Sequence, residues 1–289
     1  MRKHYRYIGI FFLICVIAAG TFVSAATKPE RFTFIVFGDN RPNRPELAQP
    51  GTFKIILRDI DSLNPAFAVN TGDSVYGASG NTLREQYKDY QETIGSLLKT
   101  KVHLALGNHE ILGSRSNQEF FDKELGDLYY SFDYGDAHFI VLDSEYVGEA
   151  GRIAGKQLEW LKEDLEKSRA AQHKFVFFHR PMYPVDGHMG KCLDQYPKER
   201  DALHKLFVQN RITAVFAGHE HLFDYQVKNG VRYIITGGAG AFLYPSIKGE
   251  GDYHHYVVVS VNGDKLEMRV VKPALQGKPR TESLVTSHQ

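Results

Sequence analysis

Short apolar runs alternate along the chain with stretches of helical periodicity. Runs rich in β-branched and aromatic residues predict strands at 32–37, 66–70, 102–106, 138–142, 174–178 and 213–217. Apolar residues at helical spacing predict helices around 53–60, 83–97, 158–165 and 199–209. Strands that alternate with amphipathic helices are typical of an α/β fold with helices on both sides of the sheets.

The last third of the chain departs from this alternation. The β-rich runs "RYIIT", "YVVVSV" and "KLEMRVV" follow one another in hairpin-like pairs. Such pairs predict a mixed sheet, or two packed sheets, rather than a wholly parallel one. We therefore expect one folded domain at 31–272, followed by a polar C-terminal tail at 273–289.

The first 25 residues differ from the rest in composition. Three basic residues precede an apolar run at 7–23, and the small residues of "VSAAT" follow it. This order is typical of a secretory signal peptide at 1–25, and it predicts an exported protein that is periplasmic, secreted or held at the cell surface. The alternative is an uncleaved membrane anchor, but the apolar run is at the short end for a spanning helix.

Charge and cysteine content limit the expected partners. The chain has 35 Lys and Arg against 34 Asp and Glu, and loss of residues 1–25 would remove three basic residues and change the net charge from +1 to −2. A chain so close to neutral is not expected to bind nucleic acid, and membrane contact is expected only through the signal segment. Without Cys15, Cys192 has no partner for a disulfide within the chain.

Five apolar runs end in polar residues that can bind metal ions. These endings are "FGDN" (37–40), "GDSVY" (72–76), "GNHE" (107–110), "FFHR" (177–180) and "GHEH" (218–221). One Gly-Asp after a strand is usually a turn or a helix cap, but five such endings in one chain are hard to explain by turns alone. Loops at the carboxyl ends of strands gather at one edge of an α/β sheet. We therefore expect these residues to meet: Asp39, Asp73, Asn108, His109, His179, His219 and His221.

The composition of this group indicates a metal site. Carboxylate, amide and imidazole ligands suit Fe, Mn or Zn, and the absence of thiolate argues against a structural zinc site. The group is larger than one ion requires, which favours two ions bridged by a carboxylate. Such a pair binds a phosphate and activates a water for attack, so the pattern predicts metal-assisted hydrolysis of a small-molecule phosphate ester.

The ordered motifs resemble those of the calcineurin-like metallophosphoesterases, and "GDSVY" with "VFFH" is most similar to the purple acid phosphatase branch. The resemblance runs from residue 32 to about residue 260. It implies an α/β fold in which two mixed β-sheets pack as a sandwich flanked by helices, with a dinuclear metal centre at one edge. It also implies that Asp73 bridges the two ions. One ion would take Asp39, Asp73, Tyr76 and His221, and the other Asp73, Asn108, His179 and His219.

One position departs from the family pattern. Many relatives have a metal-binding His two residues after the first Asp, where this chain has Arg41. A guanidinium cannot coordinate a cation. Either the first ion is weakly held or Tyr76 replaces the lost ligand, and the "GDSVY" match favours Tyr76. The remaining alternative is that Tyr76 is only an aromatic wall of the site.

The resemblance places His109 beside the substrate rather than among the ligands. There it would protonate the leaving alkoxide or contact the phosphate, oriented by Glu110 or Asp224. Arg41 and Arg180 are candidates for substrate binding, because a guanidinium fork matches phosphate oxygens, although a surface salt bridge is an almost equal alternative for each.

An irregular stretch, "PMYPVDGHMGKCLDQYP", follows Arg180. Loops in such positions shape the choice of substrate. His188, Tyr183 and Lys191 are candidates for lining the entrance of the site, although plain solvent exposure is favoured for each of them.

The sequence thus predicts an exported phosphoesterase, with phosphate monoesters favoured as substrates. A hydroxide activated by two metal ions would attack, and Asp73 and His109 would be the catalytic residues. One alternative is a phosphodiesterase that acts on cyclic nucleotides or phospholipid-type diesters. Another is a non-catalytic protein that binds phosphate or metal.

Overall fold

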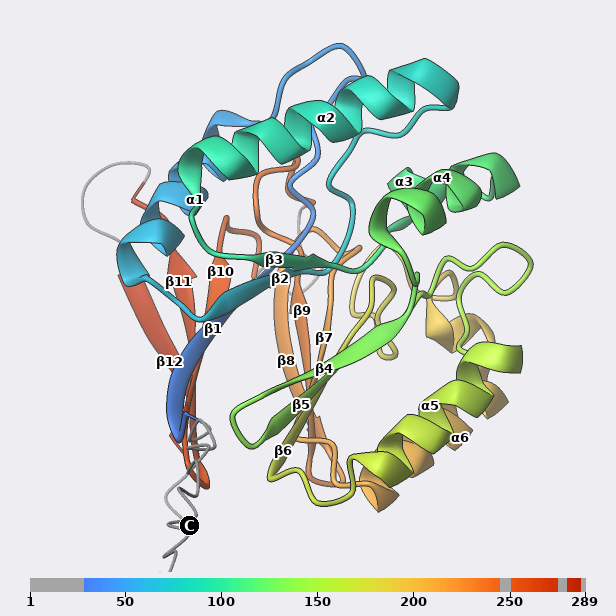
Figure 1. The fold of residues 1–289 in the computed structure, drawn as a ribbon, viewed down its shortest axis with the longest axis vertical. Coiled ribbons are helices and arrows are strands. Elements are labelled where there is room, and N and C mark those ends of the chain that lie inside the picture. Colours follow the sequence, from blue (N-terminus) through green and yellow to red (C-terminus); the bar gives the residue numbers. More distant parts are fainter. Residues whose placement is uncertain (1–28, 245–250, 275–279, 287–289) are drawn as a thin grey trace, which may run out of the picture.

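The computed structural model describes residues 29–244, 251–274 and 280–286. The predicted signal peptide at 1–25 lies outside these residues. Two six-stranded β-sheets form the centre of the fold (Figure 1). Sheet A has the order β12-β11-β10-β1-β2-β3, with strands β1 (Arg31–Phe37), β2 (Phe67–Asn70), β3 (Val102–Leu104), β10 (Tyr256–Asn262), β11 (Lys265–Lys272) and β12 (Arg280–Thr286).

Sheet B has the order β4-β5-β6-β7-β9-β8. Its strands are β4 (Tyr130–Tyr134), β5 (Ala137–Val141), β6 (His173–Phe177), β7 (Ala214–Ala217), β8 (Phe223–Lys228) and β9 (Val231–Thr236). Both sheets are mixed: β1, β2 and β3 run parallel in sheet A, as do β5, β6, β7 and β9 in sheet B, and the remaining strands pair antiparallel. The loops that follow the parallel strands within each sheet therefore leave from one edge.

Helices cover the outer face of each sheet (Figure 1). Those packed with sheet A are α1 (Gly51–Leu63), α2 (Gly80–Leu97), α3 (Asn108–Ile111) and α4 (Arg115–Leu125). Those packed with sheet B are α5 (Gly155–Lys167) and α6 (Pro197–Gln209), which is preceded by the 3-10 helix η1 (Leu193–Gln195). The layers are thus helices, sheet A, sheet B and helices, which confirms the predicted sandwich.

Strand β1 is buried on both faces, which is why its sequence is an almost unbroken apolar run. Phe32 and Phe34 pack between the two sheets, whereas Ile35 and Phe37 pack beneath the helices. Since successive side chains of a strand point to opposite faces, a strand buried on both faces must be apolar at every position. The Phe34 ring packs edge-on against Phe139 of β5, with centroids 5.2 Å apart, and so joins the two sheets.

The structure contains elements that the periodicity does not predict. These are the strands β4 and β8 and the helices α3 and α4. Residues 273–289, interpreted as a polar tail, contain β12, which pairs antiparallel with β11 and extends sheet A by one strand. The polarity is as expected, but an edge strand with exposed side chains carries little of the apolar signal by which strands are recognised.

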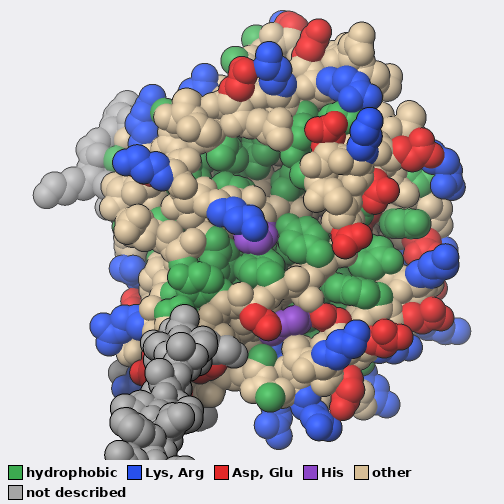
Figure 2. All heavy atoms as spheres, in the orientation of Figure 1, with side chains coloured by type: hydrophobic (Ala, Val, Ile, Leu, Met, Phe, Trp, Pro, Cys, Tyr) green, Lys and Arg blue, Asp and Glu red, His purple; other side chains and the backbone are tan. Residues whose placement is uncertain are grey.

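One face of the molecule carries a cavity that is separate from the predicted ligands. The cavity has a volume of about 720 Å³ and lies between α2, β3 and β4, with Tyr87, Tyr130 and Phe132 among its lining residues. Figure 2 shows hydrophobic side chains gathered on this face. No predicted metal ligand lines the cavity, so its volume does not identify the functional site. Among the described residues, no helix has the length and hydrophobicity needed to cross a membrane.

Candidate metal centre

The predicted ligands follow the carboxyl ends of parallel strands of both sheets, in loops or, for Asn108, at the first residue of α3. Sheet A contributes the loops after β1, β2 and β3, and sheet B those after β6 and β7. Backbone hydrogen bonds join neighbouring loops: the Asp39 N–H donates to the Gly72 carbonyl at 2.9 Å, and the Gly218 N–H donates to the His179 carbonyl at 3.0 Å. The structure brings together the side chains that the motifs singled out, namely Asp39, Asp73, Asn108, His109, His179, His219 and His221.

Three of these residues have a left-handed backbone conformation. The φ angles are 58° at Asp39, 56° at Asp73 and 70° at His219. For a residue with a Cβ this conformation costs on the order of 1 kcal/mol, and Asp and His tolerate it better than most residues. Strain of this kind is concentrated at functional sites, where the surrounding structure holds it in place.

Glycines before two ligands allow their loops to touch a carboxylate of another loop. A Cβ at Gly107 would lie 2.2 Å from Asp73 Oδ1, and a Cβ at Gly218 would lie 2.3 Å from Asp39 Oδ2. Neither gap admits a side chain. The Gly of "GNHE" and of "GHEH" is therefore required for the close approach of the loops, apart from any role in a turn.

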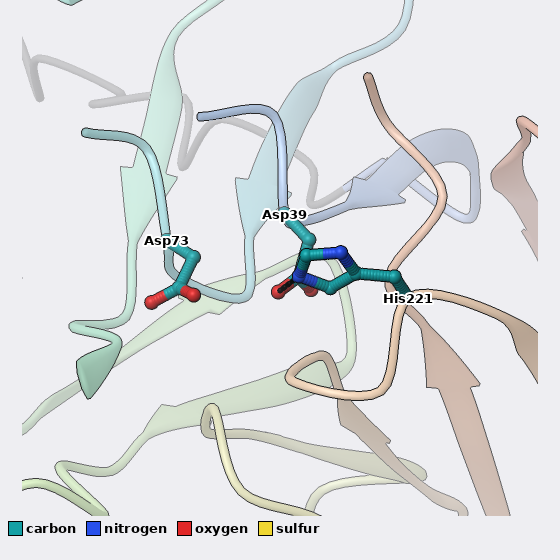
Figure 3. A group of neighbouring side chains, drawn as sticks. All are labelled: Asp39, Asp73 and His221. Atoms are coloured by element: carbon teal, nitrogen blue, oxygen red, sulfur yellow. Dashed lines mark ion pairs between the residues drawn. The ribbon is translucent and has the colours of Figure 1, made fainter. Parts of the chain in front are cut away.

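The first ligand group consists of Asp39, Asp73 and His221, which are all buried (Figure 3). Each offers one ligand atom within 4.8 Å of the others, and His221 Nε2 lies 3.4 Å from Asp39 Oδ1. Within the described part of the chain, Asp39 Oδ1 is buried without a hydrogen-bond partner. His221 Nδ1 is bonded to the Phe242 carbonyl, so Nε2 is left as the free nitrogen that faces the carboxylates.

The second ligand group surrounds His179 Nε2. Asn108 Oδ1 and His219 Nδ1 each lie 3.1 Å from this nitrogen, and Asp73 Oδ1 lies 3.3 Å from it. His179 Nδ1 donates to the Thr71 carbonyl at 3.0 Å, which leaves the Nε2 lone pair directed at the group. Asp73 thus belongs to both groups, as expected for a bridging carboxylate.

The charges of the site shift several pKa values. Burial alone would raise the pKa of Asp73, but His179, His109 and Arg41 outweigh it and lower the pKa below its ordinary value. Burial alone would lower the pKa of His179, but Asp73 and other carboxylates outweigh it and raise the pKa. Burial and nearby positive groups, His179 and Arg180 among them, place the pKa of His219 well below its ordinary value. His219 is therefore neutral, the form that binds metal.

The donor set fits two cations of the Fe, Mn or Zn type. It consists of carboxylate and amide oxygens and imidazole nitrogens, and it contains no thiolate. Two buried polar atoms, Asp39 Oδ1 and His219 Nε2, have no hydrogen-bond partner among the described residues. Unpaired buried polar atoms are costly, and a cation would compensate the carboxylate directly.

Tyr76 and Arg41 lie beside the first group. The Arg41 Nε atom is 3.6 Å from Asp73 Oδ2, and the Arg41 guanidinium carbon lies 5.9 Å from the centre of the Tyr76 ring. A permanent cation therefore sits next to the Asp73 carboxylate. Metal ligation by Tyr76 and phosphate binding by Arg41 stay predictions.

His109 is held by a backbone carbonyl, where Glu110 or Asp224 was expected to orient it. Its ring Nδ1 contacts the Tyr76 carbonyl, and its Nε2 lies 3.8 Å from Asp73 Oδ2. The Glu110 carboxylate instead accepts hydrogen bonds from the Ser74 N–H at 2.6 Å and the Gly107 N–H at 2.8 Å, so the expectation that it orients His109 is wrong. Glu110 supports the loops that carry the ligands.

Arg180 lies next to a ligand, but most of its hydrogen-bonding capacity is used within the protein. Its Nε and Nη2 donate to the two oxygens of Glu145 at 2.6 and 2.9 Å, and Nη1 donates to the Lys191 carbonyl at 2.6 Å. Phosphate binding by Arg180 stays a prediction, with few donors left to carry it out.

A comparison with protein-family models matches residues 32–223 to the model described as calcineurin-like phosphoesterase. The chain belongs to the calcineurin-like phosphoesterase family. This confirms the predicted family and the prediction of a hydrolase that acts on phosphoric esters.

Curated relatives of this calcineurin-like phosphoesterase include several phosphatases by name. Serine/threonine-protein phosphatase CPPED1 of Bos taurus is 28% identical over 74% of this chain and 70% of its own length. Acid phosphatase type 7 of Mus musculus is 31% identical over 71% of this chain and 54% of its own. Probable inactive purple acid phosphatase 9 of Arabidopsis thaliana is 27% identical over 71% of this chain, but the match spans only 38% of the length of that protein.

Solved structures agree on the fold. The purple acid phosphatase PPD1 from yellow lupin (Lupinus luteus) superimposes with a TM-score of 0.71 at 18% identity, over 88% of this chain and 54% of the lupin chain. GAP50 of Plasmodium gives a TM-score of 0.65 at 15% identity, over 90% of both chains. At such identities the likeness concerns the architecture alone.

One group of buried polar residues in this calcineurin-like phosphoesterase lies outside the five motifs. Asp143, Ser144 and Glu145 follow β5 and are buried, and Glu145 holds Arg180. The signal was present, because "FIVLDSE" (139–145) is another apolar run that ends in an acid. His188, for which solvent exposure was favoured, is half-buried, and the centre of its ring lies 4.3 Å from that of His219.

Proposed function

We propose that this chain is an exported phosphomonoesterase that works with two metal ions of the Fe, Mn or Zn type. The observation that carries the proposal is the position of Asp73. Its Oδ1 lies 3.3 Å from His179 Nε2, and its carboxylate also belongs to the group with Asp39 and His221. One carboxylate that reaches two ligand groups is the arrangement that lets two ions act on one phosphate.

When bound, two such ions would supply positive charge for the phosphate oxygens and lower the pKa of a water toward neutrality. The remaining tasks fall to side chains. His109 is partly exposed and has its ring held by the Tyr76 carbonyl, so it can give a proton to the departing alkoxide from Nε2. Arg41 would help to orient the phosphate beside Asp73.

The names of the relatives support phosphate monoesters as substrates. CPPED1 is named a serine/threonine-protein phosphatase, and acid phosphatase type 7 also carries a phosphatase name. A small-molecule monoester is the proposed substrate, with no role for nucleic acid. The family fold also accommodates the two alternatives stated above, a diesterase and a non-catalytic binding protein, and one relative is named as probably inactive.

Export is supported by the sequence of the first 25 residues. Basic residues, an apolar run at 7–23 and small residues follow one another there, in the order of a signal peptide. Expression of the full chain in a secreting host, followed by N-terminal sequencing of the exported protein, tests this. A mature chain that starts at Ala26 or Thr27 supports export. An intact N-terminus in the membrane fraction would instead show that the segment is an uncleaved anchor.

Metal analysis followed by a substrate panel tests the catalytic proposal. Purified protein is loaded in turn with Fe, Mn and Zn, its metal content is measured, and hydrolysis of p-nitrophenyl phosphate, a phosphoseryl peptide and bis-p-nitrophenyl phosphate is compared. Two metals per chain with faster monoester turnover is the expected result. Preference for the diester would favour the diesterase, and two metals without turnover would favour the binding protein.

A further inference from the structure

The loop at 181–191 reaches the predicted second metal position without the support of regular structure. It starts two residues after His179 and carries His188, whose ring contacts that of His219. Pro181 and Pro184 exclude a regular helix or a central strand over its first half. Two backbone turns, Met189 N–H to the Asp186 carbonyl at 3.1 Å and Lys191 N–H to the His188 carbonyl at 2.9 Å, order its second half, and side chains from other elements add to them.

Glu220 fixes the middle of loop 181–191. This residue is fully buried and stands between the predicted ligands His219 and His221. Its carboxylate accepts hydrogen bonds from the Val185 N–H at 2.7 Å and the Asp186 N–H at 2.8 Å. A shift of the loop would therefore disturb Glu220, which is the sequence neighbour of both His219 and His221.

Glu145 fixes the end of the same loop through Arg180. Its two oxygens accept from Arg180 at 2.6 and 2.9 Å, and the same guanidinium donates to the Lys191 carbonyl at 2.6 Å. The backbone N–H of Arg180 also donates to Ser144 Oγ at 3.0 Å. Arg180 thus ties the residues after β5, the ligand loop after β6 and the last residue of loop 181–191 together.

Stability alone is a poor explanation for these two carboxylates. Glu145 forms a buried ion pair with Arg180, and replacing such a pair with apolar side chains of similar volume is often neutral or stabilising. The buried Glu220 carboxylate accepts instead from two backbone N–H groups of the loop. What the carboxylates provide is geometry, because planar, two-oxygen hydrogen bonding fixes both position and orientation. The hydrogen bonds hold loop 181–191, which borders the site next to His219.

We propose that Glu145 and Glu220 are positioning residues that hold loop 181–191 as a rigid border of the substrate site and so set the selectivity for the leaving group. Because this inference rests on the proposed phosphomonoesterase function, its test needs one measurement that does not depend on turnover. Amide hydrogen exchange of peptides that cover 181–193 provides that measurement.

The central variant is Glu145→Gln in the metal-loaded full chain. We expect faster exchange across 181–193, a metal content equal to that of the unchanged protein, and about a tenfold change in the ratio of kcat/KM for p-nitrophenyl phosphate to that for glycerol 2-phosphate. Glu145→Asp keeps the charge and should restore part of the exchange protection. Glu199→Gln is the matched control, since Glu199 of α6 forms a more exposed pair with Arg152, which precedes α5.

Several outcomes would overturn the inference. Unchanged exchange at 181–193 in Glu145→Gln would show that the pair does not hold the loop. Loss of metal from this variant would show that Glu145 acts on the ligands instead. If the unchanged protein hydrolyses no phosphate ester, the proposed function fails, whereas the exchange data still decide whether Glu145 positions the loop. Glu220→Gln gives a second, independent exchange test should Glu145→Gln fail to fold.

Discussion

His138 of β5 bonds through Nε2 to Asp164 Oδ2 of α5, at 2.8 Å. Its Nδ1 lies 2.7 Å from Asp133 Oδ1 of β4. Ionised carboxylates only accept hydrogen bonds, so both bonds form together only when the imidazole carries two protons and a positive charge. Burial alone would lower the pKa of His138, but the bonds to Asp164 and Asp133 outweigh it and raise the pKa.

This arrangement predicts a pH-dependent stability. The folded pKa of His138 is raised, so its contribution is fully present below the unfolded pKa of about 6.5 and is lost as pH rises through the folded pKa. For Asp164, burial is outweighed by bonds to His138 and Ser131 and the pKa is lowered, so its contribution is lost only as pH falls through the folded pKa, below about 3.9.

Urea unfolding from pH 5 to 9 measures this effect. The free energy of unfolding of His138→Gln should approach that of the unchanged protein as pH rises, because both then lack the charged imidazole. His204→Gln is the control, since its ring contacts Tyr233 and Asn229 rather than carboxylates. A constant difference between His138→Gln and the unchanged protein at all pH values would contradict the prediction.

Asp73→Asn should lower both metal content and turnover, because one change removes charge from both ligand groups. We expect a loss of turnover on the order of 100-fold or more, as the metal contribution is worth several kcal/mol. Elemental analysis and p-nitrophenyl phosphate hydrolysis measure the two effects. Asp201→Asn, on the exposed surface of α6, is the control, and full activity of Asp73→Asn would rule out the bridging role.

His109→Ala should leave the metal content near that of the unchanged protein and slow esters with poor leaving groups by about 100-fold or more. Esters of p-nitrophenol need little protonation and should be slowed much less. The comparison of kcat for p-nitrophenyl phosphate with kcat for an alkyl phosphate gives the answer. An equal loss for both would indicate a role in phosphate binding or in supporting Asp73.

Tyr76→Phe tests whether Tyr76 completes the first ligand group in place of the family histidine. A phenolate bound to Fe(III) gives a visible charge-transfer band, so oxidised, iron-loaded protein should be coloured and the variant should not. The variant should also lose metal from the first group and keep the ion held by Asn108, His179 and His219. Absence of colour in the unchanged protein would remove Tyr76 from the ligands and leave the family membership intact.

The sequence predicts much of this site because its signal is local. Asp39 and Asp73 each end an apolar run, and the direction of parallel strands is enough to place them together. The interactions that hold the ligand loops could not be predicted in this way, because they join residues far apart in the sequence. Glu145 and Arg180 are 35 residues apart, and a lone acid after a strand does not say which cation it will meet.

The edge strands β4, β8 and β12 were the hardest part of the fold to predict, because their sequences carry little apolar signal. The side chains of β4 and β8 are mostly half-buried, and those described in β12 are mostly exposed. A strand stabilised on one side only by its neighbour needs few apolar side chains, so its sequence resembles that of a loop. The central strands, buried on both faces, could be read almost residue by residue.

The ligands come from both halves of the sandwich, which has a mechanical consequence. Sheet A supplies Asp39, Asp73 and Asn108, and sheet B supplies His179, His219 and His221. Bound metal would therefore add a cross-link between two layers that also pack through apolar side chains such as Phe34 and Phe139. At the same edge the layers are joined by the His219 N–H, which donates to Asp39 Oδ2 at 2.9 Å. Removal of the metal by a chelator would leave the ligand edge held by hydrogen bonds such as this one, with the buried carboxylates of Asp39 and Asp73 uncompensated.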